Sequence, residues 1–211
     1  MAAPRTTIHL VRHGEVENPD DVLYERLDGF HLSAVGQAMA RRLADHFARR
    51  ARGDVDLLLA SPLERAQETA APIAEALGLA IRTEPRVIEA RSDFAGRRID
   101  LPNLAKPSAA RRLYNPLRPS WGEPFTEIAA RMHAVIAELR DEIPGGQAIV
   151  VTHQSPAWRA RLKAEGRPLW TLPRGRACSL ASVTSLVYEG GQLGAVGYCE
   201  PAADLLPQRL R

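Results

Sequence analysis

Three short apolar segments limit the folds open to this chain. They are TTIHLV (6–11), VDLLLA (55–60) and QAIVVT (147–152), each rich in leucine or β-branched residues and bounded by charged or turn-forming residues. Strands that are apolar on both faces are typical of the buried centre of a parallel sheet. Helical patterns separate these segments, so strand and helix alternate over the first 165 residues. This alternation predicts an α/β fold, a three-layer α/β/α sandwich with a mainly parallel central sheet.

The two segments that follow the first strand and the second strand have the features of amphipathic helices. Residues 33–53 carry an apolar side chain at every fourth position, and Ser33 is the expected N-cap. Residues 61–78 open with Ser61 before a proline and a glutamate, which predicts a helix capped by Ser61.

The second half of the chain continues the pattern. Residues 123–146 are expected to form a long helix, and 155–166 a shorter one with Ser155 as its cap. Residues 181–200 alternate in polarity around two adjacent glycines, which predicts a hairpin or two neighbouring strands at a sheet edge.

Length and composition favour one globular domain. The chain has 211 residues, of which 45% are hydrophobic and 25% charged, so we expect a single domain over 1–211 with an irregular excursion at about 91–122 that covers the substrate. The net charge is only +3 and aromatic residues make up 5%, which argues against a nucleic-acid partner. No segment has the length of a signal peptide core or a membrane span, so a cytoplasmic protein without a membrane partner is expected. The sequence does not determine the oligomeric state.

Basic residues follow three of the predicted strands. The first strand leads into Arg12 and His13, the second into a helix that carries Arg65 in its first turn, and the later strand into His153 and Gln154. Ligands of open α/β sheets bind beyond the carboxyl ends of the strands, where helix N-termini also favour anions. The sequence therefore predicts a pocket for a phosphate group at this edge of the sheet.

The segments that carry these residues resemble a known family. LVRHGE, SPLERAQETA and VTHQSP are similar, in the same order, to the three signature segments of the histidine phosphatase superfamily, also called the phosphoglycerate-mutase-like family. The resemblance covers most of residues 6–200. It implies the phosphoglycerate-mutase-like fold and a phosphomonoester hydrolase of the histidine acid phosphatase type.

The resemblance also implies a role for each basic residue. His13 would attack the phosphoryl group as a neutral imidazole and form a phosphohistidine, which water then hydrolyses. Arg12, Arg65 and His153 would hold the phosphoryl oxygens, and His153 counts as catalytic for this reason. Gln154 stands where family members often have glycine, and we place it with the phosphate-binding residues.

Hydrolysis also needs a group that protonates the departing alkoxide and activates water. The family takes this carboxylate from a glutamate after the third strand, and RVIEARSDFAG offers Glu89 at the matching place. Asp93 and Glu15 are the alternatives to Glu89.

The sequence gives no reason to expect a cofactor or a metal. It has neither a GxGxxG motif nor a phosphate-binding P-loop, the usual signs of a nucleotide cofactor. His9, His13 and Glu15 would share a strand face, an arrangement that metal ligands can have, but the nearby arginines would oppose a bound cation.

Three functions are compatible with this pattern. The first is a phosphatase that acts on a small phosphorylated molecule through a phosphohistidine on His13. The second is a phosphoglycerate-type mutase with the same pocket, since Arg111, Arg112 and Arg118 resemble the substrate-carboxylate region of mutases. The third is a non-catalytic module that binds a phosphorylated ligand or a protein.

Overall fold

A six-stranded mixed sheet forms the centre of the computed structural model, which describes residues 4–50, 54–98, 122–171 and 176–206. The strands are β1 (Arg5–Arg12), β2 (Val55–Ala60), β3 (Ile81–Thr83), β4 (Gln147–Thr152), β5 (Val183–Glu189) and β6 (Gln192–Cys199). Their order in the sheet is β3-β2-β4-β1-β5-β6. The first four strands of this order pair in parallel, whereas β5 and β6 run antiparallel to their neighbours. The expected α/β fold with a mainly parallel sheet is therefore confirmed.

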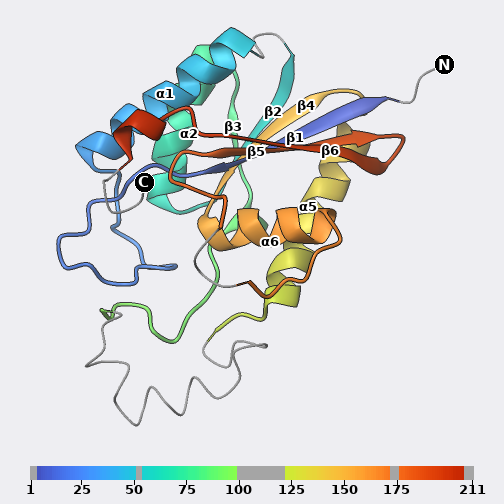
Figure 1. Cartoon of the computed structure of the whole chain (residues 1–211). Coiled ribbons are helices and arrows are strands. Elements are labelled where there is room, and N and C mark those ends of the chain that lie inside the picture. The colour runs from blue at the N-terminus through green and yellow to red at the C-terminus, as the bar shows by residue number, and fades with distance from the viewer. Residues whose placement is uncertain (1–3, 51–53, 99–121, 172–175, 207–211) are drawn as a thin grey trace.

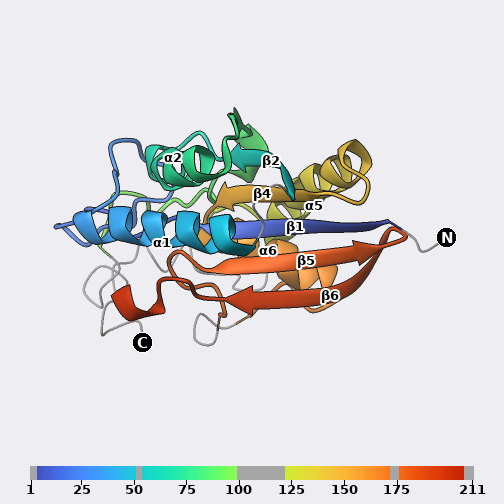
Figure 2. The ribbon, with the colours of Figure 1, turned by 90° about the horizontal axis from the view of Figure 1, so that it is seen from above.

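Helices cover both faces of the sheet (Figures 1 and 2). They are α1 (Ala34–Arg50), α2 (Glu64–Leu77), α5 (Phe125–Glu142) and α6 (Gln154–Ala164), with short 3-10 helices at Pro85–Val87 and Ala203–Leu205. Helices α1 and α2 pack together over one face, and α5 and α6 lie on the other (Figure 1). Each face has its own apolar core, one around Leu43 and Ile149 and one around Leu10 and Met132. These layers form the three-layer sandwich that the alternation of strand and helix predicts.

The sequence locates the strands better than the helix caps. Ser33 caps α1 as expected, because its hydroxyl oxygen accepts a hydrogen bond from the amide of Gly36 at 3.0 Å. Ser61, in contrast, does not cap α2, which begins only at Glu64. Its amide still pairs with the carbonyl of Val151 in β4, and its hydroxyl lies 2.8 Å from Nε2 of His153. Ser61 therefore extends the second strand, and the chain turns into the helix after it.

The prediction that Ser155 caps the following helix is also wrong. The N-cap of α6 is His153, and Ser155 lies inside the first turn. Strand β4 ends at Thr152, so the chain passes from strand to helix within a single residue. The hairpin expected at 181–200 is confirmed as β5 and β6, whose connecting Gly190 and Gly191 have φ values of 55° and 87°, as a tight hairpin turn requires.

Two expectations fall outside the part of the chain that the structure describes. Residues 99–121 belong to the predicted excursion at 91–122 and include Arg111, Arg112 and Arg118. The single domain over 1–211 likewise stays a prediction. Among the described residues, the helices are too short or too polar to cross a membrane.

The segment between β1 and α1 forms a closed loop. Its two ends meet where the carbonyl of Glu15 accepts a hydrogen bond from the amide of Ser33 at 3.0 Å and Val16 pairs with Leu32. The backbones of Gly14 and Gly36 touch at the same point, and a Cβ on Gly14 would lie 2.6 Å from the carbonyl oxygen of Gly36. Only glycine permits this approach.

Candidate active site

The strand register brings the two histidines of the predicted pocket together. Arg12, the last residue of β1, pairs with Thr152, the last residue of β4. The residues that follow are His13 and His153, and the amide of His13 donates to the carbonyl of Thr152 at 3.0 Å. Their imidazole centroids lie 5.1 Å apart. The expected meeting of residues that are remote in sequence is therefore present in the fold.

The imidazole of His13 is oriented by the backbone. Its side chain is buried, with 2% of the residue exposed, and Nδ1 lies 2.7 Å from the carbonyl oxygen of Gly14. A carbonyl oxygen can only accept, so Nδ1 carries the proton and the lone pair of Nε2 is free. Burial first, and then the positive charges of Arg12 and Arg65, hold the pKa of His13 well below its usual value. His13 is therefore a neutral imidazole with an available nitrogen at neutral pH.

His153 is buried beside His13 and bonded on one side only. Its exposed fraction is 0%, and Nε2 lies 2.8 Å from the hydroxyl of Ser61. Its Nδ1 is also buried, and no described residue bonds to it. Burial and the neighbouring His13 hold the pKa of His153 well below its usual value. If the hydroxyl of Ser61 donates to Nε2, the proton of His153 lies on Nδ1, where it can be donated to a ligand.

Two arginines bring positive charge to the histidines. Arg12 donates from Nη1 to the carbonyl of Cys178 at 2.8 Å, and Arg65, with 0% exposed, donates to the carbonyl of Glu25. Nε of Arg12 and both Nε and Nη1 of Arg65 are buried without a partner among the described residues. The guanidinium of Arg65 also lies 4.8 Å from the ring centroid of Tyr24. Buried donors without acceptors are unfavourable in an empty site and favourable when an anion binds.

A cavity of about 340 Å³ opens at this edge of the sheet. Of the predicted site residues, Arg12, His13, Glu89 and Gln154 line it, whereas Arg65 and His153 are fully buried and are not among its lining residues. Gln154 is the first residue of α6, so the free amides of a helix N-terminus lie at the cavity wall.

Glu89 is the one of the three candidate carboxylates that lines the cavity. Its Oε1 accepts a hydrogen bond from the amide of Ala90 at 2.7 Å, and burial raises its pKa. Asp93 is exposed, and Glu15 accepts a hydrogen bond from the hydroxyl of Ser33 at 2.8 Å, at the start of α1. Neither alternative lies at the cavity wall. His9, the histidine within β1, bonds Ser185 and Gln147 through its two ring nitrogens, away from the cavity.

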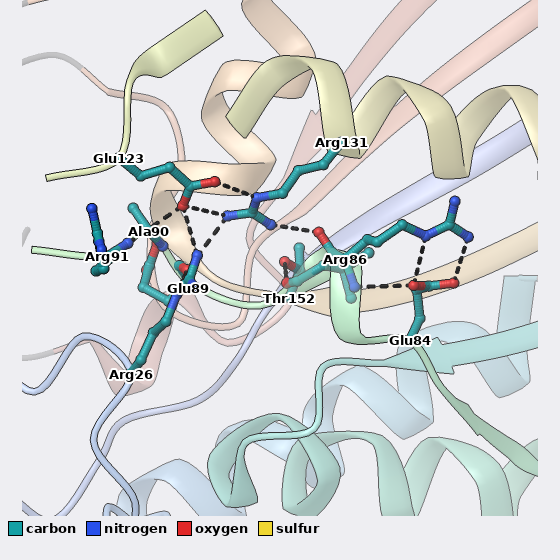
Figure 3. Close-up of polar contacts among 10 residues, drawn as sticks. Arg26, Glu84, Arg86, Glu89, Ala90, Arg91, Glu123, Arg131 and Thr152 are labelled. Carbon is teal, nitrogen blue, oxygen red and sulfur yellow. Dashed lines mark hydrogen bonds and ion pairs between the residues drawn. The ribbon is translucent and has the colours of Figure 1, made fainter. Parts of the chain in front are cut away.

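A network of charged side chains fixes the backbone of Glu89 (Figure 3). Its carbonyl oxygen accepts from Nε of Arg26 at 2.6 Å and from Nη2 of Arg131 at 3.4 Å. Both arginines also bind the carboxylate of Glu123, at 2.7 Å and 2.8 Å. The segment that carries Glu89 is therefore tied to the loop before α1 and to helix α5.

Sequence reasoning missed Tyr24 and Glu25, which enter the cavity wall from the closed loop between β1 and α1. Burial and the nearby charge of Glu89 raise the pKa of Glu25 to about 8. Glu25 also has a φ of 37°, a left-handed conformation that is uncommon outside glycine and is concentrated at functional sites. The loop has no periodic pattern, so no signal in the sequence marks these residues.

Comparison with known proteins gives a consistent picture. The model of the histidine phosphatase superfamily (branch 1) matches residues 8–200. An uncharacterised protein of Mycobacterium tuberculosis, Rv0525, is 50% identical over 200 residues, which cover 94% of this chain and 98% of the relative. A probable phosphoglycerate mutase, GpmB, of Escherichia fergusonii is 27% identical over 205 residues, with 94% and 93% of the two chains covered. The structure of a mycobacterial glucosyl-3-phosphoglycerate phosphatase, Rv2419c, has the same fold, with a TM-score of 0.72, 22% identity, and coverage of 92% and 96%.

Proposed function

This chain belongs to branch 1 of the histidine phosphatase superfamily, and we propose that it hydrolyses a small phosphomonoester through a phosphohistidine on His13. The observation that carries this proposal is the hydrogen bond from Nδ1 of His13 to the carbonyl of Gly14. It leaves Nε2 unprotonated in a buried, positively charged site, which is the state that a nitrogen nucleophile needs.

The first step forms a bond between Nε2 of His13 and phosphorus and breaks the bond from phosphorus to the alcohol oxygen. Arg12, Arg65 and Nδ1 of His153 donate to the phosphoryl oxygens, where charge spreads in the transition state. Gln154 and the amides at the start of α6 bind the same group. The donors of Arg12, Arg65 and His153 that lack partners among the described residues support this assignment.

Glu89 supplies the proton that the departing alkoxide requires. Burial raises the pKa of Glu89, which favours the protonated acid near neutral pH. In the second step the Glu89 carboxylate takes a proton from water, the water oxygen bonds to phosphorus, and the bond to Nε2 breaks. Inorganic phosphate and free His13 result, with Glu89 protonated again.

Phosphate release from p-nitrophenyl phosphate and from a panel of phosphorylated metabolites, with and without EDTA, tests this function. We expect release that chelation does not change. His13→Ala should abolish both turnover and the covalent capture of phosphate seen by mass spectrometry, whereas His46→Ala, a histidine of α1 outside the cavity wall, should retain both. Glu89→Gln should lower kcat by about 10²- to 10⁴-fold and weaken phosphate binding far less. Normal activity of His13→Ala would refute the mechanism.

A mutase is the second candidate, because the probable phosphoglycerate mutase GpmB is 27% identical over 94% of the chain. It would retain the phosphoryl donor in the same pocket and return the group to another hydroxyl. Interconversion of phosphoglycerates without phosphate release would identify it. Absence of both reactions across the panel would favour a module that only binds its ligand.

A further inference from the structure

The cavity contains a second pair of arginines apart from those that surround His13. Arg159 belongs to α6, and Arg176 precedes β5, and both line the cavity wall. Arg159 lies four residues after Ser155, which lines the wall at the start of the same helix. Four residues of an α-helix span about 6 Å, so the backbone of Arg159 lies about one helical turn from the N-terminus that is proposed to bind the phosphoryl group. Arg176 is close enough to Arg159 for its charge to act on it.

Arg159 is fixed in place, and no carboxylate of the described residues pairs with it. It is 1% exposed, Nη1 donates to the carbonyl of Leu169 and to the hydroxyl of Thr171, and the guanidinium lies 3.8 Å from the ring centroid of Phe125. Its Nε is buried without a partner among the described residues. These contacts orient the guanidinium, but none of them neutralises its charge.

Arg176 is a second arginine of the cavity wall without a paired carboxylate among the described residues. Its Nε is buried and unpartnered, and within the described residues no hydrogen bond or ion pair joins its guanidinium to the protein. Burial, and after it the charge of Arg176, lowers the pKa of Arg159 to about 10, so the two cations repel each other. Burial also lowers the pKa of Arg176.

The carboxylates of the cavity wall balance these two charges only in part. Glu123 is bound by Arg26 and Arg131. Burial lowers the pKa of Arg176 and the charge of Glu89 partly offsets this, but burial raises the pKa of Glu89 itself, which disfavours its charged form. Burial and the charge of Glu89 likewise raise the pKa of Glu25 to about 8. A buried cation without an acceptor is unfavourable by several kcal/mol in general, and an anionic ligand removes this penalty.

We propose that Arg159 and Arg176 bind a second anionic group of the substrate, a carboxylate or a second phosphate, while the first phosphoryl group lies at His13. Guanidinium groups recognise the oxygens of both anions through paired hydrogen bonds. The inference rests on the proposed function and narrows it: the substrate is a phosphomonoester with a further anionic group a short chain away from the ester.

Two matched pairs of esters test this inference. 3-Phosphoglycerate and glycerol 3-phosphate differ in one carboxylate, and fructose 1,6-bisphosphate and fructose 6-phosphate differ in one phosphate. We expect the wild type to favour the more anionic member of at least one pair in kcat/KM. Arg159→Gln and Arg176→Gln should each lower that preference by about 10- to 100-fold, mainly through KM, as expected for the loss of a charged hydrogen bond. Preference in the first pair assigns a carboxylate, and preference in the second assigns a phosphate.

Arg161→Gln is the matched control, because Arg161 lies on the same helix but pairs with Glu165 at 2.9 Å and does not line the cavity. It should leave the preference unchanged. If Arg159→Gln does not fold, the result for Arg176→Gln decides the inference. This variant should fold, because the side chain of Arg176 is not bonded to the described residues. Equal kcat/KM within both pairs, or a preference that survives in the arginine variants, would overturn the inference.

Failure of the proposed function gives a different result, namely no phosphate release from any ester or from p-nitrophenyl phosphate. Calorimetric binding of the same four esters to His13→Ala then decides the inference. Tighter binding of the more anionic member that depends on Arg176 would support the second-anion site, and equal affinities would refute it.

Discussion

Glu25 and Glu89 form a pair of carboxyl groups in the cavity that should make the stability of the protein depend on pH. In the folded state burial and the charge of Glu89 raise the pKa of Glu25 to about 8, from an ordinary value of 4.5. Between these values Glu25 holds a proton in the folded chain that it has lost in the unfolded chain. The stabilisation is therefore complete below pH 4.5 and is lost as the pH rises toward 8.

The expected magnitude follows from the proton difference. While the folded state holds one extra proton, each unit by which the pH rises lowers the free energy of unfolding by about 1.4 kcal/mol. The loss between pH 6.5 and 8 is therefore about 2 kcal/mol. Glu25→Gln should remove most of this loss, because glutamine does not titrate. The measurements begin at pH 6.5 because of His13 and His153, whose pKa values are lowered in the folded state. As the pH falls below 6.5 these histidines take up protons in the unfolded chain, which lowers the free energy of unfolding and opposes the effect of Glu25.

Urea unfolding of the wild type and Glu25→Gln at four pH values from 6.5 to 8 measures this difference. The gap between the two free energies of unfolding should grow by about 2 kcal/mol in favour of the variant as the pH rises. Glu17→Gln, at an exposed position of the same loop, is the control and should follow the wild type. Parallel curves for the wild type and Glu25→Gln would show that Glu25 does not retain a proton in the folded state.

Two further substitutions test the groups that orient the site. Ser61→Ala removes the partner of His153 Nε2, so kcat should fall about tenfold with little change in KM, and the free energy of unfolding should fall by about 1 kcal/mol because a buried acceptor loses its donor. Ser61→Thr should restore kcat, and an unchanged kcat in Ser61→Ala would contradict the role. Glu123→Gln leaves Arg26 and Arg131 without their charged partner, and because Glu123 is 13% and Arg131 16% exposed we expect a loss of about 2 kcal/mol in unfolding free energy. A loss below about 0.5 kcal/mol, the usual range for a surface substitution, would show that solvent already screens these charges.

The sequence predicts the sheet and the residues at its carboxyl edge because both depend on strong local signals. The segments 55–60 and 147–152 are observed with the predicted bounds as β2 and β4. Their side chains are buried on both faces, so the apolar run itself marks the strand. His13 and His153 follow strands that are paired in register, which is why placing the strands was sufficient to place both histidines.

The missed residues depend on contacts between segments that are far apart in the chain. Ser61 has the local signature of a helix cap, but its hydroxyl lies instead beside His153, 92 residues later. Glu25 and Arg176 belong to segments without periodicity, so only the folded chain shows that they share a cavity with His13. Arg159 has the appearance of an ordinary helical arginine, and its burial follows from the packing of α6 against Phe125 and the segment after it.

The closed loop between β1 and α1 can change the shape of the cavity wall without altering the sheet. Because Glu15 and Ser33 are joined by a hydrogen bond and Gly14 touches Gly36, the chain leaves the sheet and returns to it at one fixed point. Doubling the length of such a loop raises its closure free energy by only about 0.6 kcal/mol. Insertions between 18 and 30 can therefore reshape the wall around Tyr24 while the strand that carries His13 keeps its register.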